Sequence, residues 1–182
     1  DLADGELLQL SNVSNHSFSE SVYFDVIRKK TAALFAACTK AAAFSVGVGE
    51  EEAEFARLLG EYIGICFQIQ IKDDIFDYFD SKEIGKPTGN DMLEGKLTLP
   101  ALYVLNSTKD SAMLEIAIRV KEGTATPDEI ARLIGFIKEN GGIVHTMNLY
   151  KQKAFGLLAS LPDSDVCAAL RAYLDYVVDR EK

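Results

Sequence analysis

Ile69 to Tyr78, IQIKDDIFDY, is the stretch of this sequence that decides its fold and the interpretation of the rest. It places three carboxylates, Asp73, Asp74 and Asp77, inside an apolar run that extends from Tyr62 to Phe79. The run predicts a continuous helix, and a repeat of 3.6 residues per turn puts Asp73 and Asp77 on one face. Asp74 is expected near the edge of that face.

Clustered carboxylates on a helix need a stabilising partner. Like charges four residues apart destabilise a helix by about 0.2–0.5 kcal/mol, and apolar neighbours add a desolvation cost. A hard divalent cation offsets both, and magnesium is usually held by one or two carboxylates together with water and substrate phosphate. The alternative is an ordinary solvated acidic surface, which is the usual environment of acidic residues.

The segment after this run favours a ligand site. Gly85 to Pro100, GKPTGNDMLEGKLTLP, is predicted to be a glycine-rich loop that carries Lys86 and Lys96. Glycine lets the backbone approach a ligand closely, and lysine is a point-charge partner for phosphate. Carboxylates for a metal followed by lysines for phosphate predict a diphosphate site.

These motifs carry a resemblance to a known family. KDDIFDY followed by GKPTGNDMLEGKLTLPAL resembles the second aspartate-rich region of the trans-type isoprenyl (polyprenyl) diphosphate synthases. Upstream, Lys30-Thr31 in RKKTAALF resembles the lysine–threonine pair of that family, and DGELLQL resembles the helix before it. The similarity covers essentially the whole chain, and the members that it resembles are bacterial long-chain, octaprenyl-type synthases.

The resemblance implies an all-α fold, an orthogonal or antiparallel helical bundle of the isoprenoid synthase type. Family members carry an earlier DDxxD motif followed by a pair of arginines, and this sequence has no such motif. We therefore expect residues 1–182 to be the C-terminal part of a single isoprenoid synthase domain, truncated at its N-terminus and inactive alone.

The resemblance also implies a reaction and its site. The intact enzyme would condense isopentenyl diphosphate with an allylic diphosphate to make a trans-polyprenyl diphosphate. Asp73 and Asp77 would hold Mg²⁺, with Asp74 bound directly or through water.

Further residues would bind the diphosphate. Lys30, Lys86 and Lys96 would neutralise its charge, while Thr31 and Gln70 would donate hydrogen bonds to it. The family glutamine could equally be Gln68, if two residues are inserted after it. Helix geometry favours Gln70, because it shares the face of the aspartates in a regular helix, whereas a π-bulge would favour Gln68.

Three other interpretations remain. A terpene cyclase or head-to-head condensing enzyme shares the aspartate-rich helices, but the glycine–lysine loop favours the elongating synthases. A noncatalytic partner subunit of a prenyl diphosphate synthase would explain the missing first motif. A non-enzymatic helical scaffold is the simplest alternative.

Composition excludes several classes of protein. The net charge of −9 argues against nucleic-acid binding and against attraction to anionic membranes, and no apolar run is long enough to span a bilayer. Cys38, Cys66 and Cys167 lie far apart in apolar surroundings, which predicts free buried thiols in a reducing, cytoplasmic compartment. His16 and His145 are isolated from each other and are not expected to bind metal. By resemblance, the intact enzyme would be a homodimer.

Start and stop signals place the remaining helices. Ser17 and Glu20 have the spacing of a capping box, and Thr126-Pro127 with Glu129 is a second start signal, for which Asn140-Gly141-Gly142 is the matching stop. Pro100 is expected in the first turn of its helix, where proline is tolerated. The C-terminal helix is expected to bury an apolar set at helical spacing, namely Val166, Leu170, Tyr173, Leu174 and Val177. Helices are expected at about 1–13, 18–46, 50–79, 97–105, 110–121, 127–139, 143–158 and 163–179.

Overall fold

The computed structural model describes residues 2–13, 18–70, 75–79 and 89–179, and every regular element within these ranges is a helix. The lack of strands among these residues confirms the predicted all-α class. In chain order the elements are α1 (Leu2–Val13), α2 (Glu20–Ile27), η1 (Arg28–Ala32), α3 (Ala33–Ser45), α4 (Glu50–Gln70), η2 (Phe76–Tyr78), α6 (Asn90–Leu93), α7 (Leu99–Thr108), α8 (Ser111–Lys121), α9 (Pro127–Glu139), α10 (Gly142–Ala159) and α11 (Asp165–Asp179).

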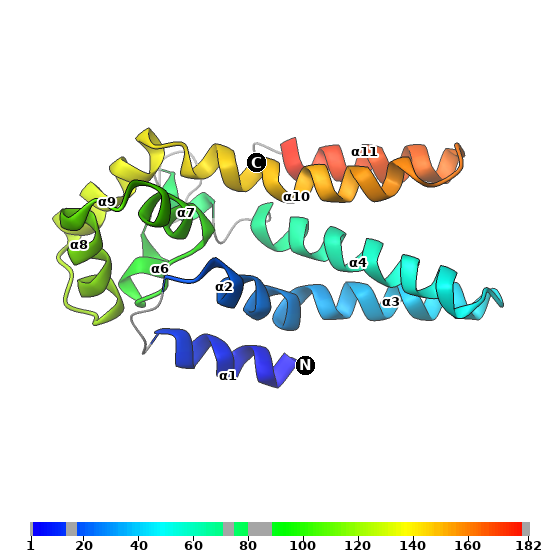
Figure 1. Cartoon of the computed structure of the whole chain (residues 1–182), viewed down its shortest axis with the longest axis horizontal. Coiled ribbons are helices and arrows are strands. Elements are labelled where there is room, and N and C mark those ends of the chain that lie inside the picture. Colours follow the sequence, from blue (N-terminus) through cyan, green and yellow to red (C-terminus); the bar gives the residue numbers. More distant parts are fainter. Residues whose placement is uncertain (1, 14–17, 71–74, 80–88, 180–182) are drawn as a thin grey trace.

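The helices form two long antiparallel pairs with a cluster of short helices at one end (Figure 1). α2, η1 and α3 run on from one another as a single rod, and α4 returns along α3. α10 and α11 pack against α4 on the side away from α3. α1 lies along α2 and η1, while α6 to α9 gather near the start of the rod.

A π-helical turn, Arg28–Ala32, interrupts the rod. Tyr23 and Ile27 are buried before the turn, Ala32 is buried as its last residue, and Ala36 is buried after it. Ile27 and Ala32 are five residues apart, whereas the other neighbouring pairs of this set are four apart. Hydrogen bonds from i to i+5 absorb the extra residue, so the buried stripe continues along the rod.

The rod begins later than the sequence predicts. Ser17, the predicted N-cap, lies outside the described residues, and the helix starts at Glu20 with Ser19 as its cap. The Ser19 hydroxyl accepts a hydrogen bond from the Val22 amide at 3.4 Å. The predicted cap at Ser17 is therefore wrong by two residues, because Ser19 has the extended backbone of a cap and its side chain accepts from the first turn.

Two glycines let α4 lie directly against the rod. A Cβ atom added to Gly64 would stand 2.8 Å from the Ala32 Cα, and one added to Gly60 would stand 2.7 Å from the Phe35 carbonyl oxygen. Backbone therefore meets backbone at both positions. This close contact fixes η1 on α4, and Phe35 and Phe67 pack their rings 5.1 Å apart beside it.

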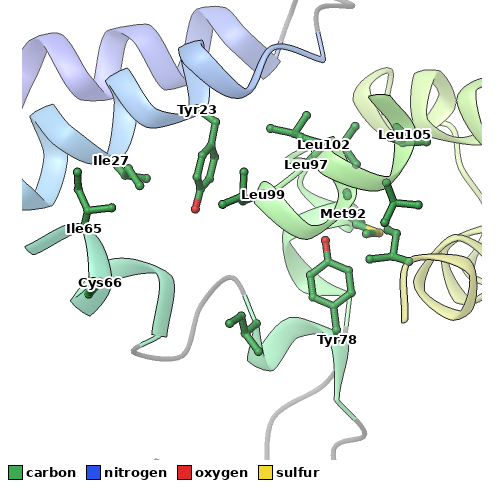
Figure 2. Close-up of a cluster of buried hydrophobic side chains, with 14 of the residues drawn as sticks. Tyr23, Ile27, Ile65, Cys66, Tyr78, Met92, Leu97, Leu99, Leu102 and Leu105 are labelled. Carbon is green, nitrogen blue, oxygen red and sulfur yellow. The ribbon is translucent and has the colours of Figure 1, made fainter. Parts of the chain in front are cut away.

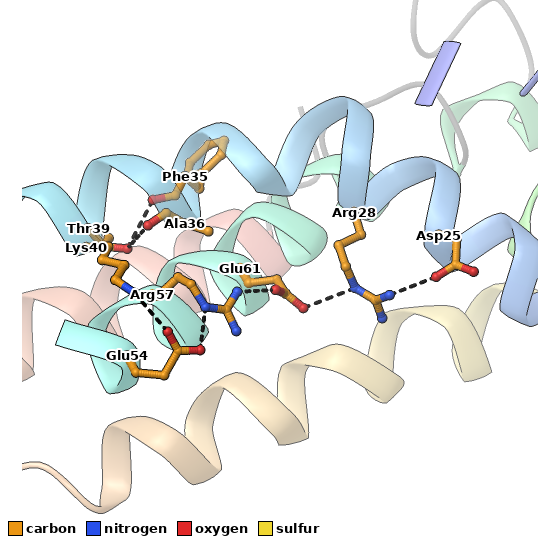
Figure 3. A network of polar contacts seen from close by, with 9 residues as sticks. All are labelled: Asp25, Arg28, Phe35, Ala36, Thr39, Lys40, Glu54, Arg57 and Glu61. Carbon is orange, nitrogen blue, oxygen red and sulfur yellow. Dashed lines mark hydrogen bonds and ion pairs between the residues drawn. The ribbon is translucent and has the colours of Figure 1, made fainter. Parts of the chain in front are cut away.

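A network of ion pairs joins the rod to α4 beside this backbone contact (Figure 3). Glu61, only 13% exposed, accepts hydrogen bonds from Arg28 of η1 at 3.1 Å and from Arg57 at 2.6 Å. The pKa of Glu54 is lowered mainly by its hydrogen bond from Arg57, and Lys40 adds a second. Exposed pairs contribute little singly, but this network joins the π turn and α3 to α4 over two helical turns.

The predicted continuous helix from Tyr62 to Phe79 is wrong. α4 ends at Gln70, and Phe76–Tyr78 is a separate 3₁₀ turn. In a 3₁₀ turn residues three apart lie on the same side, so Ile75 and Tyr78 both enter the core, with 6% and 2% exposure. Asp77 is not on α4, and the expected shared helical face of Asp73 and Asp77 does not apply.

The core that results joins the elements around this turn (Figure 2). Tyr78 donates or accepts a hydrogen bond with Thr98 at 3.2 Å, at the start of α7. Leu99 and Leu102 of α7 and Ile65 of α4 are almost fully buried in the same cluster. The core therefore sets the positions of α2, α4, η2 and the chain before α7.

Helix signals in the C-terminal half are confirmed. Thr126 and Glu129 form the predicted capping box, in which the Glu129 amide donates to the Thr126 hydroxyl and the Thr126 amide donates to Glu129. The backbone bond from Thr126 is the main cause of the lowered pKa of Glu129. Gly141, with φ of 75°, ends α9, and Pro100 lies in the first turn of α7 as expected.

Three side chains predicted to be buried are exposed. Val166 and Tyr173 of α11 are 69% and 42% exposed, because α11 packs on α10 and α4 through one side only, where Leu174 is buried. Cys38 lies on the exposed side of α3 for a similar reason. Cys66 and Cys167 are buried as predicted, and burial raises the pKa of the Cys66 thiol to about 12.

Within the described residues, none of the helices combines the length and the apolar character that a bilayer span requires.

We predict that Gly64→Ala destabilises the fold by about 1–3 kcal/mol, since the new methyl group would overlap the Ala32 backbone. Urea unfolding followed by circular dichroism measures the change. Gly156→Ala is the matched control, because it also lies within a long helix and a Cβ there meets nothing within 4 Å. Helix propensity predicts that this control gains up to about 1 kcal/mol. Equal stabilities for the two variants would contradict the close contact.

Candidate functional site

A cavity of about 160 Å³ opens between α1, the rod, α8 and the chain that leads into α7. Its walls bring together residues that are far apart in the sequence. Lys30 and Thr31 come from η1, and Lys96 comes from the glycine–lysine segment. The remaining lining residues are Gln9, Asn12, Tyr23, Val26, Ile27, Asp91, Gly95, Leu97, Thr98 and Lys121.

Lys30 reaches the cavity from the π turn. Its Nζ donates to the Gln9 Oε1 at 2.8 Å and forms an ion pair with Glu6 at 2.9 Å, so both acceptors come from α1. The side chain remains 32% exposed. π turns are rare and frequently occur at functional sites, and here the turn directs two consecutive residues, Lys30 and Thr31, to one cavity.

Lys96 lines the same cavity from the segment between α6 and α7. The backbone turns at Gly95, with φ of 77°, and the Lys96 amide donates to the Asp91 carbonyl at 2.8 Å. Its ammonium forms an ion pair with Glu94, and this hydrogen bond raises the pKa of Lys96 and lowers that of Glu94. Both groups are charged at neutral pH.

Asp77 connects the aspartate-rich segment to this wall. Its two carboxylate oxygens accept hydrogen bonds from the amides of Asn90, at 2.8 Å, and Asp91, at 3.1 Å. Its carbonyl oxygen accepts from the Gly89 amide at 2.9 Å. Asp77 thus holds the start of α6, and Asp91 of the same helix lines the cavity.

Four predicted site residues are not placed by this geometry. Asp73, Asp74 and Lys86 lie outside the described residues, and so do the side chains of both Gln68 and Gln70. α4 ends at Gln70, so the helical face that favoured Gln70 over Gln68 no longer decides between them. The π-bulge considered for this region stays a prediction, because residues 71–74 lie outside the described residues.

Asp77 has the donor chemistry that a magnesium site needs. A carboxylate offers about four lone-pair positions, so oxygens that each accept one N–H retain capacity for a hard cation. Within the described ranges, no three acidic, histidine or cysteine residues form a cluster that could hold a metal. A metal site at Asp77 would therefore need further ligands outside the described residues, where the predicted Asp73 and Asp74 lie.

Lys121 is a cavity residue that sequence reasoning missed. It is 8% exposed, and its Nζ donates to the Asn12 carbonyl at 2.8 Å. The available signal was its position on α8, four residues after Ala117 and thus on the buried face. Asn12 itself has a buried Oδ1 with no hydrogen-bond partner among the described residues.

Comparison with known proteins identifies the family of the chain. The sequence profile described as Polyprenyl synthetase matches residues 1–137. The chain belongs to this family. Polyprenyl synthetases similar to it include the octaprenyl diphosphate synthase of Haemophilus influenzae, 34% identical over 98% of this chain and 55% of the relative. The heptaprenyl diphosphate synthase component 2 of Bacillus subtilis is 31% identical over 97% of this chain and 50% of the relative.

Solved structures of polyprenyl synthetases have the same fold. The geranylgeranyl pyrophosphate synthase of Bacteroides thetaiotaomicron is 76% identical with a TM-score of 0.88, over 98% of this chain and 60% of that one. A decaprenyl diphosphate synthase from Rhodobacter capsulatus is 34% identical with a TM-score of 0.85, over 100% of this chain and 56% of that one. The chain spans about half the length of the curated relatives that it matches.

We predict that Asp77→Ala exposes the amides of Asn90 and Asp91, because both lose their acceptor. Loss of such a cap costs about 0.5–2 kcal/mol, so exchange at these two amides should accelerate by roughly 2- to 30-fold. Hydrogen exchange measured by NMR gives the rates. Asp110→Ala is the control, since Asp110 caps α8 through the Met113 amide and should affect that helix alone. Unchanged exchange at Asn90 and Asp91 would contradict the role of Asp77.

Proposed function

We propose that this chain provides part of the active site of a prenyltransferase, which condenses isopentenyl diphosphate with an allylic diphosphate to make a trans-polyprenyl diphosphate. The observation that carries the proposal is the cavity that Lys30 and Thr31 of the π turn line together with Lys96. The names of the similar proteins span geranylgeranyl to decaprenyl products, so the proposal concerns the reaction and not the product length.

The chemistry requires positive charge at the leaving group. Ionisation of the allylic carbon–oxygen bond expels diphosphate, and cations around the departing oxygens lower that barrier as negative charge develops. In our proposal Lys30, Lys86 and Lys96 neutralise the diphosphate, while Thr31 and the family glutamine, Gln70 or Gln68, donate hydrogen bonds. Lysine suits this role because its ammonium is a compact charge with three donors.

Magnesium would be held by Asp73 and Asp77, with Asp74 bound directly or through water. When bound, the ion supplies further positive charge to the diphosphate. Asp77 lies beside the backbone of Asn90 and Asp91, so carboxylates that bind the metal would adjoin the wall that carries Lys96.

The apolar part of the cavity would shield the reaction from water. Val26, Ile27 and Leu97 line it together with the charged residues, and each belongs to a well-packed, mostly buried region. Exclusion of water strengthens the electrostatic interactions within a site and protects a carbocation from hydrolysis.

We further propose that the chain is the C-terminal part of one isoprenoid synthase domain and does not turn over alone. Its first aspartate-rich motif is absent from the sequence, and the match covers about half of each curated relative. We also propose that the intact enzyme is a homodimer and that it is cytoplasmic. The free thiols of Cys66 and Cys167 are consistent with the reducing conditions of the cytoplasm.

One observation favours a second candidate function. The relatives from Bacillus subtilis and Geobacillus stearothermophilus are named as component 2 of a heptaprenyl diphosphate synthase. The chain could accordingly act as one component of a synthase that needs a partner subunit, whereas a terpene cyclase finds no support among these names. A product assay with labelled isopentenyl diphosphate, with and without proteins that co-purify from native cells, separates the candidates.

We predict that the full chain binds inorganic pyrophosphate in the presence of Mg²⁺, and that Lys30→Met and Lys96→Met each weaken binding by roughly 10- to 100-fold. Each variant removes a hydrogen bond to a charged group, which contributes about 1.5–3 kcal/mol. Isothermal titration calorimetry measures the affinity. Lys109→Met removes the same charge from an exposed position and should leave binding unchanged. Unaltered affinity in both cavity variants would refute the site.

We predict that Asp73→Asn in the intact enzyme lowers turnover by roughly 10²-fold or more at fixed magnesium, a loss typical of removing one charge-stabilising group. Steady-state assays across a magnesium series measure the effect. Asp163→Asn, which alters an exposed carboxylate before α11, is the control. Near-normal turnover of the Asp73 variant would count against the metal assignment.

A further inference from the structure

α1 is held to the rest of the chain by polar contacts on both sides of the cavity. Toward its middle, Gln9 and Glu6 contact the Lys30 ammonium at 2.8 and 2.9 Å. At its C-terminal end, the Asn12 carbonyl accepts from Lys121 Nζ at 2.8 Å. α1 therefore contacts two ammonium groups, those of Lys30 and Lys121, and both lysines line the same cavity.

Lys121 is placed to hold the end of a helix. The last carbonyls of an α-helix lack partners within the helix and carry the negative end of its dipole, so a cation there is favourable. Asn12 is the penultimate residue of α1. The Lys121 ammonium also lies 5.7 Å from the centre of the Phe18 ring, on the chain that follows α1.

The burial of Lys121 indicates a specific role. At 8% exposure the ammonium loses most of its hydration, and this desolvation lowers the pKa of Lys121. A buried charge is costly unless its donors are satisfied, so the bond to Asn12 must be maintained in the folded state. Surface lysines of this chain, such as Lys109, bear no such constraint.

The contacts of α1 link the two lysines. Within the described residues α1 packs mainly on α2 and η1, whereas Lys121 ties its C-terminal end to α8. Gln9 and Asn12 are three residues apart on one helix, so a displacement of the α1 end moves the acceptor of Lys30 as well.

We propose that Lys121 is a positioning residue of the anion site, which fixes the direction of the Lys30 ammonium through α1. Its ligand, a diphosphate, rests on the function proposed above. Lys121 acts on α1, and α1 through Gln9 and Glu6 keeps Lys30 directed along the cavity wall. Lys121 is not itself a diphosphate contact in this proposal.

The first experiment measures binding of pyrophosphate with Mg²⁺ by the full chain. Lys121→Met should weaken binding by roughly 3- to 30-fold, the range expected for coupled neighbours. Lys121→Arg keeps a cation with N–H donors and should restore most of the affinity. Lys109→Met is the matched control for loss of one charge. Wild-type affinity in Lys121→Met would overturn the proposal.

A double-mutant cycle distinguishes positioning from direct contact. If Lys121 acts through Lys30, then Lys121→Met should cause no further loss in a Lys30→Met background. Additive losses would mean that Lys121 acts on the anion independently, and the proposal would fall.

A ligand-free readout keeps this test separate from the proposed function. The NMR signal of the Lys30 ε-methylene group, assigned through Lys30→Arg, reports the contacts of its ammonium. It should shift in Lys121→Met, return in Lys121→Arg and stay unchanged in Lys109→Met. An unchanged Lys30 signal in a folded Lys121→Met protein overturns the proposal. Failure of the wild-type chain to bind pyrophosphate would instead overturn the function while this signal still tests the positioning.

Discussion

The close approach of α4 to the rod is the constraint on which the rest of the structure depends. Gly60 and Gly64 leave no side chain between the two backbones, so η1 lies directly on α4. A larger residue would separate the helices and carry Lys30 and Thr31 away from the wall that holds Lys96. The Arg28–Glu61 ion pair acts at the edge of this contact and contributes less, because it is partly exposed.

The charges of the cavity are compensated within the protein. Lys30 has Glu6 and Lys96 has Glu94, in a chain whose net charge is −9. Attraction of a diphosphate therefore comes from local geometry and not from the overall field, which repels anions. In our proposal, an entering diphosphate would share or displace these carboxylates.

The sequence predicted well what local chemistry determines. The capping box at Thr126 and Glu129, the stop at Gly141 and the all-α class all follow from short-range signals. It failed where tertiary packing decides: the helix break before Ile75 and Tyr78 places both in the core, and the exposure of Val166 depends on which side of α11 has a neighbour. Two predicted lysines, Lys30 and Lys96, line one cavity, but the link of Lys121 to α1 joins residues too distant in sequence for any spacing rule.

The π turn directs Lys30 and Thr31 to the cavity without disturbing the buried side chains of the rod before and after it. Tyr23 and Ile27 precede it, Ala32 is its last residue and Ala36 follows it. All four are buried, and only the five-residue step between Ile27 and Ala32 departs from α-helical periodicity. Deleting one residue within that step would restore an ordinary helix while every flanking side chain kept its direction. Such a protein would keep its helical bundle but would no longer direct Lys30 and Thr31 to the cavity. The deletion of a single codon would therefore remove the proposed diphosphate site without changing the fold.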